Sequence, residues 1–132
     1  MDPLEGDVLV AELGVRPVGL VGWLRGGTFS AADEAEVRVL IVEPEARRIG
    51  VGSRLLSEAE RRMAAAGIRK GWLVTTNDNL DAQAFYRDNA WLVTAIHAGA
   101  VDDMRRELKP SIPEVAANGL PIRDELILSK AL

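Results

Sequence analysis

Between residues 36 and 76 the chain follows a strand pattern with a helix pattern and then another strand pattern, and few folds accommodate that order. Residues 36–42 alternate at first and end wholly apolar, which is typical of a strand buried on both faces at its far end. Apolar residues then recur at three- and four-residue steps over 50–66, and 71–76 form the next apolar run. A helical crossover of this kind predicts that the two strands are parallel.

The remaining patterns complete one small α/β domain. Two short strand patterns, 8–13 and 18–24, flank a turn-forming cluster and predict a hairpin. The later elements are a helix over 80–89, a strand over 91–97, a turn of helix near 104–108 and a last strand over 125–128. With 132 residues there is room for one ordinary core. We predict a single domain, residues 1–132, of α/β (α+β) class, with helices on the faces of a mixed sheet.

Composition excludes several kinds of chemistry. The chain has no cysteine and one histidine, so thiolate or His-rich metal sites and Ser-His mechanisms are not expected, and we predict no metal. No apolar run approaches the roughly 18 residues of a membrane span, and Met1–Glu5 is acidic where a signal peptide would be basic. The net charge of −4 and the few aromatic residues argue against nucleic acid. We therefore expect a cytoplasmic protein with neither a membrane nor a nucleic-acid partner.

Basic residues are concentrated in one block of this acidic chain. Residues 47–70 carry seven basic and two acidic side chains. The later members of the block are typical of the solvated face of a helix. Arg47, Arg48 and Arg54 differ, because they surround two glycines at the predicted start of a helix, where anions bind.

The segment from Arg47 to Ser53, Arg-Arg-Ile-Gly-Val-Gly-Ser, is the sharpest motif. Glycines at 50 and 52 let the backbone approach a bulky anion, and the N–H groups of the first helical turn point toward it. The alternative is an ordinary helix start with glycines for tight packing. No Gly-Lys-Ser/Thr of a Walker loop follows, and Leu55 stands where a dinucleotide fingerprint has its third glycine.

Two motifs in order resemble those of one enzyme family. Arg47-x-x-Gly50-x-Gly52, between a strand and a helix, resembles the acyl-coenzyme A signature of the GNAT superfamily of N-acetyltransferases. The segment from Asn79 to Trp91, with asparagine seven residues before Tyr86, resembles the second conserved block of that superfamily. The resemblance covers roughly residues 8–132.

The resemblance implies a GNAT-like acyl-CoA N-acyltransferase fold that lacks most of the N-terminal strand and two helices, because seven residues precede Val8. It also implies acetyl-CoA as acyl donor, with its pantetheine arm in a V-shaped split between strands 36–42 and 71–76. The arm would pair with backbone near Leu40 to Val42, and amides of Arg48 to Ser53 would hold the pyrophosphate. The residues thus assigned to the cofactor are Leu40, Ile41, Val42, Arg47, Arg48, Ile49, Gly50, Val51, Gly52, Ser53, Asn79 and Tyr86.

Acyl transfer to an amine needs a proton for the departing thiolate, polarisation of the thioester carbonyl, and a neutral amine. Tyr86, the only tyrosine, is the candidate general acid, and a main-chain N–H near Ile41 the candidate oxyanion donor. Glu36 is the base we assign to the site, and its alternative is an exposed strand carboxylate opposite a basic residue. Further candidates for the base are Asp78, His97, Asp124 and Glu125. For Asp78 the alternative is turn capping.

The function we expect is transfer of acetyl from acetyl-CoA to a primary amine by direct attack, catalysed by Tyr86. The alternative is a non-catalytic acyl-CoA-binding or assembly module. A missing N-terminal segment would leave the hairpin as an open sheet edge, which a second copy of the chain would cover in a homodimer. The long 99–123 segment is a candidate wall of the acceptor site.

Overall fold

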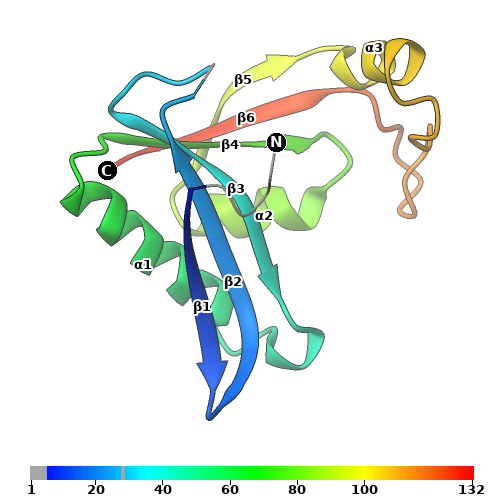
Figure 1. The fold of residues 1–132 in the computed structure, drawn as a ribbon. Coiled ribbons are helices and arrows are strands. Elements are labelled where there is room, and N and C mark those ends of the chain that lie inside the picture. Colours follow the sequence, from blue (N-terminus) through cyan, green and yellow to red (C-terminus); the bar gives the residue numbers. More distant parts are fainter. Residues whose placement is uncertain (1–5, 28) are drawn as a thin grey trace. The chain divides into compact units, whose positions relative to one another are not determined.

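The computed structural model describes residues 6–27 and 29–132 (Figure 1). The Met1–Glu5 segment, on which part of the localisation prediction rests, lies outside the described residues. The strands are β1 (Asp7–Leu13), β2 (Arg16–Arg25), β3 (Glu34–Val42), β4 (Lys70–Thr76), β5 (Leu92–His97) and β6 (Glu125–Ala131). The helices are the short 3-10 helix η1 (Pro44–Ala46), α1 (Val51–Ala65), α2 (Leu80–Asp88) and α3 (Ala100–Glu107).

The strands form a mixed six-stranded sheet in the order β1-β2-β3-β4-β6-β5. β1 pairs with β2, β2 with β3, and β5 with β6, all antiparallel. β3 and β4 are parallel, with Glu34–Glu36 opposite Lys70–Trp72. This parallel pair, the sheet class and the hairpin confirm the expectations drawn from the sequence. The two-residue turn at Gly14 and Val15 closes the hairpin.

The chain divides into two compact units. Unit 1 contains the described residues up to Trp72 together with Ala131–Leu132, and unit 2 contains Leu73–Lys130. In unit 1, α1 packs on β1, β2 and β3 through Leu56, Ala59 and Met63, which are fully buried. In unit 2, the core is built around Trp91 and Leu128, exposed by 0% and 1%. The prediction of one domain over residues 1–132 stays a prediction.

A glycine in β2 sets how closely α1 approaches the sheet. A Cβ added at Gly19 would lie 2.9 Å from the carbonyl oxygen of Ile41 and 3.1 Å from Cδ1 of Leu55. Both distances are shorter than ordinary van der Waals contact, so a larger residue would push Leu55 and its helix away from β2. Gly19 thereby holds the start of α1 near the end of β3.

Two elements differ by three residues or more from those expected from the sequence. α3 runs from Ala100 to Glu107, where only a turn near 104–108 was expected. β6 continues to Ala131, three residues beyond its predicted end. Trp72 in β4 is half-buried, and its indole N–H donates to Oγ of Ser30 over 2.5 Å.

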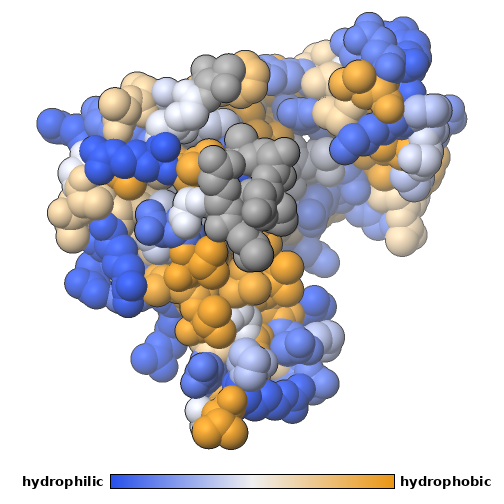
Figure 2. All heavy atoms as spheres, in the orientation of Figure 1, coloured by the Kyte–Doolittle hydropathy of each residue, from blue (hydrophilic) through white to orange (hydrophobic). Residues whose placement is uncertain are grey.

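Apolar side chains gather on the surface around β1 (Figure 2). Val10 and Leu13 are 54% and 52% exposed, Val8 is 38% exposed, and Val15 in the following turn is 96% exposed. β1 is also an end strand of the sheet order, so its outer backbone groups have no strand neighbour among the described residues. Unit 1 therefore presents an apolar strand edge.

Candidate active site

The connection from β3 to α1 is held to the end of β3. η1 follows β3 directly, and its Ala46 is buried, with 1% exposure. Nε of Arg47 donates to the carbonyl oxygen of Val42 over 3.2 Å. These two contacts fix where the chain turns into the Arg47–Ser53 segment, which we call the cradle.

The cradle has two residues in the left-handed region of backbone space. Gly50 has φ +82°, and a Cβ added there would meet nothing within 4 Å, so its conformation and not crowding requires glycine. Arg48 has φ +70°, which costs an ordinary side chain about 1–2 kcal/mol. Strain of this kind concentrates at functional sites, where the backbone must present groups in a fixed direction.

The N-terminus of α1 has neither a side-chain cap nor an acidic residue. Gly50 is the residue before the helix, no side chain caps it, and no acidic residue stands in the first turn. The first main-chain bond into the helix is donated by the amide of Arg54 to the carbonyl of Gly50, over 3.0 Å. The amides of Val51 and Gly52 therefore lack intrahelical partners, and the positive end of the helix dipole lies behind them.

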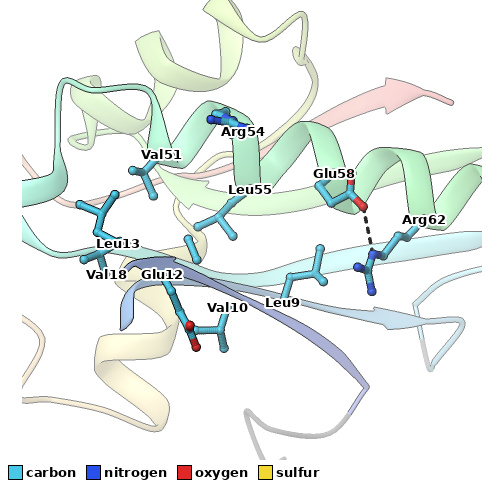
Figure 3. Close-up of a pocket in the computed structure, with 11 residues that line it drawn as sticks. Leu9, Val10, Glu12, Leu13, Val18, Val51, Arg54, Leu55, Glu58 and Arg62 are labelled. Atoms are coloured by element: carbon cyan, nitrogen blue, oxygen red, sulfur yellow. Dashed lines mark hydrogen bonds and ion pairs between the residues drawn. The ribbon is translucent and has the colours of Figure 1, made fainter. Parts of the chain in front are cut away.

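A groove of about 350 Å³ lies between β1 and α1 in unit 1 (Figure 3). Leu9 and Leu13 point toward the helix, whereas Val10 and Glu12 point away. Val51, which belongs to the cradle, and Arg54, which follows it, line the groove. Farther along α1, Arg62 donates to Glu58 over 3.2 Å. Arg54 makes no ion pair within the described residues, so its charge is available beside the cradle.

The predicted pantetheine strand is the end of β3. Leu40, Ile41 and Val42 lie opposite residues 19–21 of β2 on one edge. Ile41 is 56% exposed, which is unusual for a residue in the wholly apolar end of a strand pattern. Near the start of β3, partial burial raises the pKa of the Glu36 carboxyl, and the guanidinium of Arg38, 3.3 Å away, opposes that rise.

Asn79 and Tyr86 lie in unit 2. Oδ1 of Asn79 accepts from the amide of Ala82 over 3.1 Å and so caps α2. Tyr86 stands edge-on to the rings of Phe85 and Trp91, at centroid distances of 5.2 and 6.0 Å. Burial raises the pKa of Tyr86 to about 12, so its hydroxyl keeps its proton at neutral pH. No hydrogen bond to this hydroxyl occurs among the residues that the structure describes.

The other candidates for the base have different surroundings. His97 is exposed at the end of β5. Oδ1 of Asp124 accepts from the amide of Gly99 over 2.8 Å, and Glu125 starts β6. Oδ1 of Asp78 is buried without a hydrogen-bond partner among the described residues. The capping role that was the alternative for Asp78 is filled by Asn79.

The assigned residues therefore fall into two groups, each within one unit. Unit 1 contains the end of β3, the cradle that follows it and Glu36 near the start of β3, and unit 2 contains Asn79 and Tyr86. The sequence did not single out Asn77 and Arg105, which make the densest polar networks of unit 2. The run of turn-forming residues at 77–79 could have drawn attention to Asn77, whereas no feature of the sequence marks Arg105.

Residues 6–27 and 29–132 lack two features. None of the helices there is both long and apolar enough to cross a membrane. Nor do these residues contain a cluster of three or more His, Cys, Asp or Glu side chains suited to a metal ion.

Comparison with known proteins decides the family. The model of the acetyltransferase (GNAT) family matches residues 2–90, which is more than half of the chain. The chain is 35% identical to the uncharacterized protein YdhI of Bacillus subtilis (strain 168) over 131 residues, 99% of this chain and 76% of YdhI. The chain belongs to the GNAT acetyltransferase family. A second relative, the uncharacterized YxbD of the same organism, is 36% identical over 100 residues, which cover 76% of this chain and 62% of YxbD.

Solved structures of GNAT acetyltransferases share the fold. A Bacillus subtilis acetyltransferase in complex with CoA superposes with a TM-score of 0.80 at 19% identity, over 96% of this chain and 77% of that one. A GNAT family acetyltransferase from Elizabethkingia anophelis with acetyl-CoA bound gives 0.78 at 17% identity, over 96% and 76%. The family and the GNAT-like α/β fold expected from the sequence are thus confirmed. The absence of an N-terminal strand and two helices stays a prediction.

The raised pKa of Glu36 makes the stability of this GNAT protein depend on pH. Below the ordinary carboxyl pKa, Glu36 is neutral in both folded and unfolded chains. As the pH rises through its folded pKa, the partly buried carboxylate costs stability. We expect Glu36→Gln to raise the free energy of unfolding at neutral pH relative to the native chain, and this gain should vanish near about pH 3. Denaturant unfolding at both pH values measures it.

Removing the opposing cation provides the matched comparison. Arg38→Gln should raise the pKa of Glu36 further, so it should destabilise the protein more at neutral pH than in acid. A gain from Glu36→Gln that is equal at both pH values would contradict the burial of this carboxyl as the cause.

Proposed function

We propose that this protein is an acetyl-CoA-dependent N-acetyltransferase that moves acetyl to a primary amine by direct attack. The observation that carries the proposal is the uncapped, acid-free N-terminus of α1 in a GNAT chain, preceded by the strained turn at Arg48 and Gly50. Related structures with CoA and acetyl-CoA support the same donor here.

The cradle would hold the pyrophosphate of the donor. Amides from Arg48 to Ser53 supply the hydrogen bonds, and the guanidinium groups of Arg47, Arg48 and Arg54 supply positive charge. The amide groups of the pantetheine arm would pair with backbone of Leu40 to Val42, as a strand does. Asn79 would contact the donor through its amide nitrogen, because its Oδ1 already caps α2.

The reaction then needs four events. The amine nitrogen forms a bond to the thioester carbonyl carbon, and the carbon–sulfur bond breaks. The nitrogen loses one proton, which Glu36 accepts directly or through water, and the sulfur gains one. Tyr86 donates a hydrogen bond to the leaving sulfur and supplies its proton, which the proton lost by the nitrogen replaces within the same turnover, and a main-chain N–H near Ile41 stabilises the oxyanion. A raised pKa suits Glu36 to accept a proton closer to neutral pH than an ordinary glutamate.

The apolar edge of β1 supports a homodimer. Val10 and Leu13 are more than half exposed, and the groove beside them has an apolar floor. A strand edge is self-complementary in antiparallel pairing about a two-fold axis, so a second copy of β1 fits it without any other partner. The homodimer predicted from the sequence remains our proposal for what covers β1.

Binding of the donor can be tested without knowing the acceptor. Acetyl-CoA at about 100 times its Kd should stabilise the folded protein by roughly 2.7 kcal/mol, whereas ATP should do little. Gly50→Ala should raise the Kd for acetyl-CoA by about tenfold or more, because alanine disfavours the left-handed turn. Thermal unfolding and calorimetry measure both effects.

Gly14→Ala is the matched control for the cradle variant. Gly14 also has a positive φ, +65°, with open space around it, but it lies in the β1–β2 turn. Gly14→Ala should lower the free energy of unfolding by an amount similar to that of Gly50→Ala and should leave the affinity for acetyl-CoA unchanged. Equal affinity in both variants, or no stabilisation of the native chain by acetyl-CoA, would remove the cradle from the proposal.

Tyr86→Phe separates the enzyme from a mere binder of acyl-CoA. The ring contacts stay while the hydroxyl is lost, so kcat should fall by about 10²–10⁴-fold and the Kd for acetyl-CoA should change little. Thiol release with a panel of amines measures the rate. An unchanged kcat would exclude Tyr86 from the mechanism. If the native chain binds acetyl-CoA but transfers acetyl to no amine, the non-catalytic alternative holds.

Light scattering tests the dimer. The native chain should have twice the mass of one copy, and Val10→Lys should yield single copies, because a charge at the centre of β1 opposes apolar pairing. Leu108→Lys, at a residue 76% exposed in unit 2, is the control and should leave the mass unchanged. A single-copy native protein would exclude the β1 dimer.

A further inference from the structure

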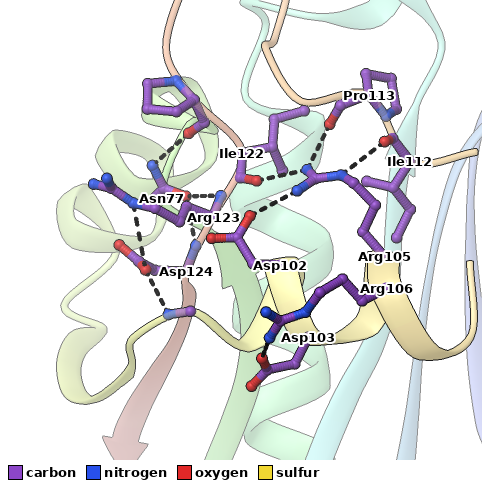
Figure 4. Close-up of polar contacts among 12 residues, drawn as sticks. Asn77, Asp102, Asp103, Arg105, Arg106, Ile112, Pro113, Ile122, Arg123 and Asp124 are labelled. Atoms are coloured by element: carbon purple, nitrogen blue, oxygen red, sulfur yellow. Dashed lines mark hydrogen bonds and ion pairs between the residues drawn. The ribbon is translucent and has the colours of Figure 1, made fainter. Parts of the chain in front are cut away.

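The turn between β4 and α2 is fastened by the side chain of Asn77. Its Nδ2 donates to the carbonyl of Pro121 over 2.8 Å, and its Oδ1 accepts from the amides of Arg123 and Asp124, each at 2.9 Å (Figure 4). The amide of Asn77 also donates to the carbonyl of Asp124 over 3.0 Å. One side chain thus joins the turn to the segment that leads into β6.

The neighbouring polar groups of the turn are also bonded within unit 2. The carbonyl of Asp78 accepts from Nδ2 of Asn118 over 2.9 Å and from the amide of Leu80. Oδ1 of Asn79 caps α2. The turn is therefore held rigidly by α2 and by the segment that leads into β6. The position of Asp78 is fixed by hydrogen bonds in which its own carboxyl group takes no part.

The carboxyl group of Asp78 is the exception in this network. Its Oδ1 is buried and accepts no hydrogen bond among the described residues, although Asp78 as a whole is only half-buried. Leaving a buried acceptor unbonded costs about 1–3 kcal/mol, and more when the group is charged. Such exceptions in a well-bonded structure call for a functional explanation.

The cationic side chains of unit 2 near this turn already have hydrogen-bond or ion-pair partners. The guanidinium of Arg105 is only 14% exposed and donates to Asp102 and to the carbonyls of Ile112, Pro113 and Ile122 (Figure 4). Arg123 pairs with Asp124 at 3.8 Å. No salt bridge to Asp78 is formed within the part of the chain that the structure describes.

We propose that the Asp78 carboxylate binds a primary ammonium group of the acetyl acceptor. Because the charge is shared by both carboxylate oxygens, a cation at the other oxygen, Oδ2, also offsets the cost of the buried Oδ1. The inference rests on the proposed acetyltransferase function and names the residue that selects the acceptor. The ammonium is either the one that reacts after losing its proton or a second one on the same acceptor.

The test compares Asp78→Asn with Asp81→Asn. Asp81 is an exposed acid in the first turn of α2, three residues away, so its loss controls for a general change of charge. The acceptors are n-butylamine and 1,4-diaminobutane, with acetyl-CoA saturating. Asp78→Asn should raise the KM for the amine by about tenfold or more, whereas Asp81→Asn should change it less than about twofold. If Asp78→Asn raises the KM for both amines, Asp78 binds the ammonium that reacts. If it raises the KM for 1,4-diaminobutane alone, Asp78 binds the second ammonium.

Binding provides a readout that does not depend on turnover. Either amine should raise the Tm of the native protein, in a salt-sensitive manner, and Asp78→Asn should abolish this shift. Without amine, Asp78→Asn should melt no lower than the native chain, because it removes the charge from a carboxyl group whose Oδ1 is buried and unbonded.

The failures of the two proposals are distinguishable. If acetyl-CoA neither binds nor donates acetyl, the proposed function fails. If the native protein uses acetyl-CoA but Asp78→Asn keeps the native KM for amines, the inference about Asp78 fails alone. It also fails if no amine shifts the native Tm, or if Asp78→Asn melts lower than native while its amine shift is intact, since Asp78 would then be a structural residue.

Discussion

The close packing of α1 against β2 is the contact on which the candidate donor site depends. Gly19 leaves no room for a side chain between the carbonyl of Ile41 and Leu55, so the helix lies as near to the sheet as the backbone permits. The buried face of Leu56, Ala59 and Met63 then fixes the helix along its length. As a result, the first turn of α1 follows the end of β3 after only a short turn, and its amides face outward at the cradle.

Polar contacts hold the parts of unit 2 that lie outside its apolar core. α2 has no fully buried residue, and α3 has one, Val101. The irregular segment 108–124 is held instead by Arg105, whose guanidinium bonds to three of the segment's carbonyls, and by Asn77. Buried polar groups that are fully bonded define one arrangement sharply, whereas an unbonded one stands out. For this reason the unbonded carboxyl group of Asp78 points to a function, whereas an exposed aspartate would not.

Hydrophobic periodicity predicted the helices and strands that the local sequence determines. It failed for α3, whose structure depends on contacts with residues distant in the sequence. The strands and helices up to Trp91 have clear periods of two or 3.6, and the structure confirms them. α3 offered few apolar positions, and it is fixed by bonds from distant residues: the amide of Val101 donates to Arg123, and Gly99 to Asp124. Sequence spacing does not show which carbonyls the guanidinium of Arg105 will meet, so the first turn of α3 was not predicted. The cradle was predictable because glycines, arginines and a strand-to-helix junction coincide in seven residues.

The pKa of Tyr86 limits what its hydroxyl does in the proposed reaction. A phenol with a pKa of about 12 is a weak acid beside a thiol whose pKa is about 8.5, so complete transfer of its proton to the thiolate is uphill by roughly 5 kcal/mol. In the proposed reaction, Tyr86 would therefore lower the barrier chiefly by donating a hydrogen bond to the sulfur while the carbon–sulfur bond breaks. If the proton does cross, the one leaving the amine nitrogen must replace it in the same turnover. The burial that makes the hydroxyl a poor acid also keeps it protonated and available as a donor at every physiological pH.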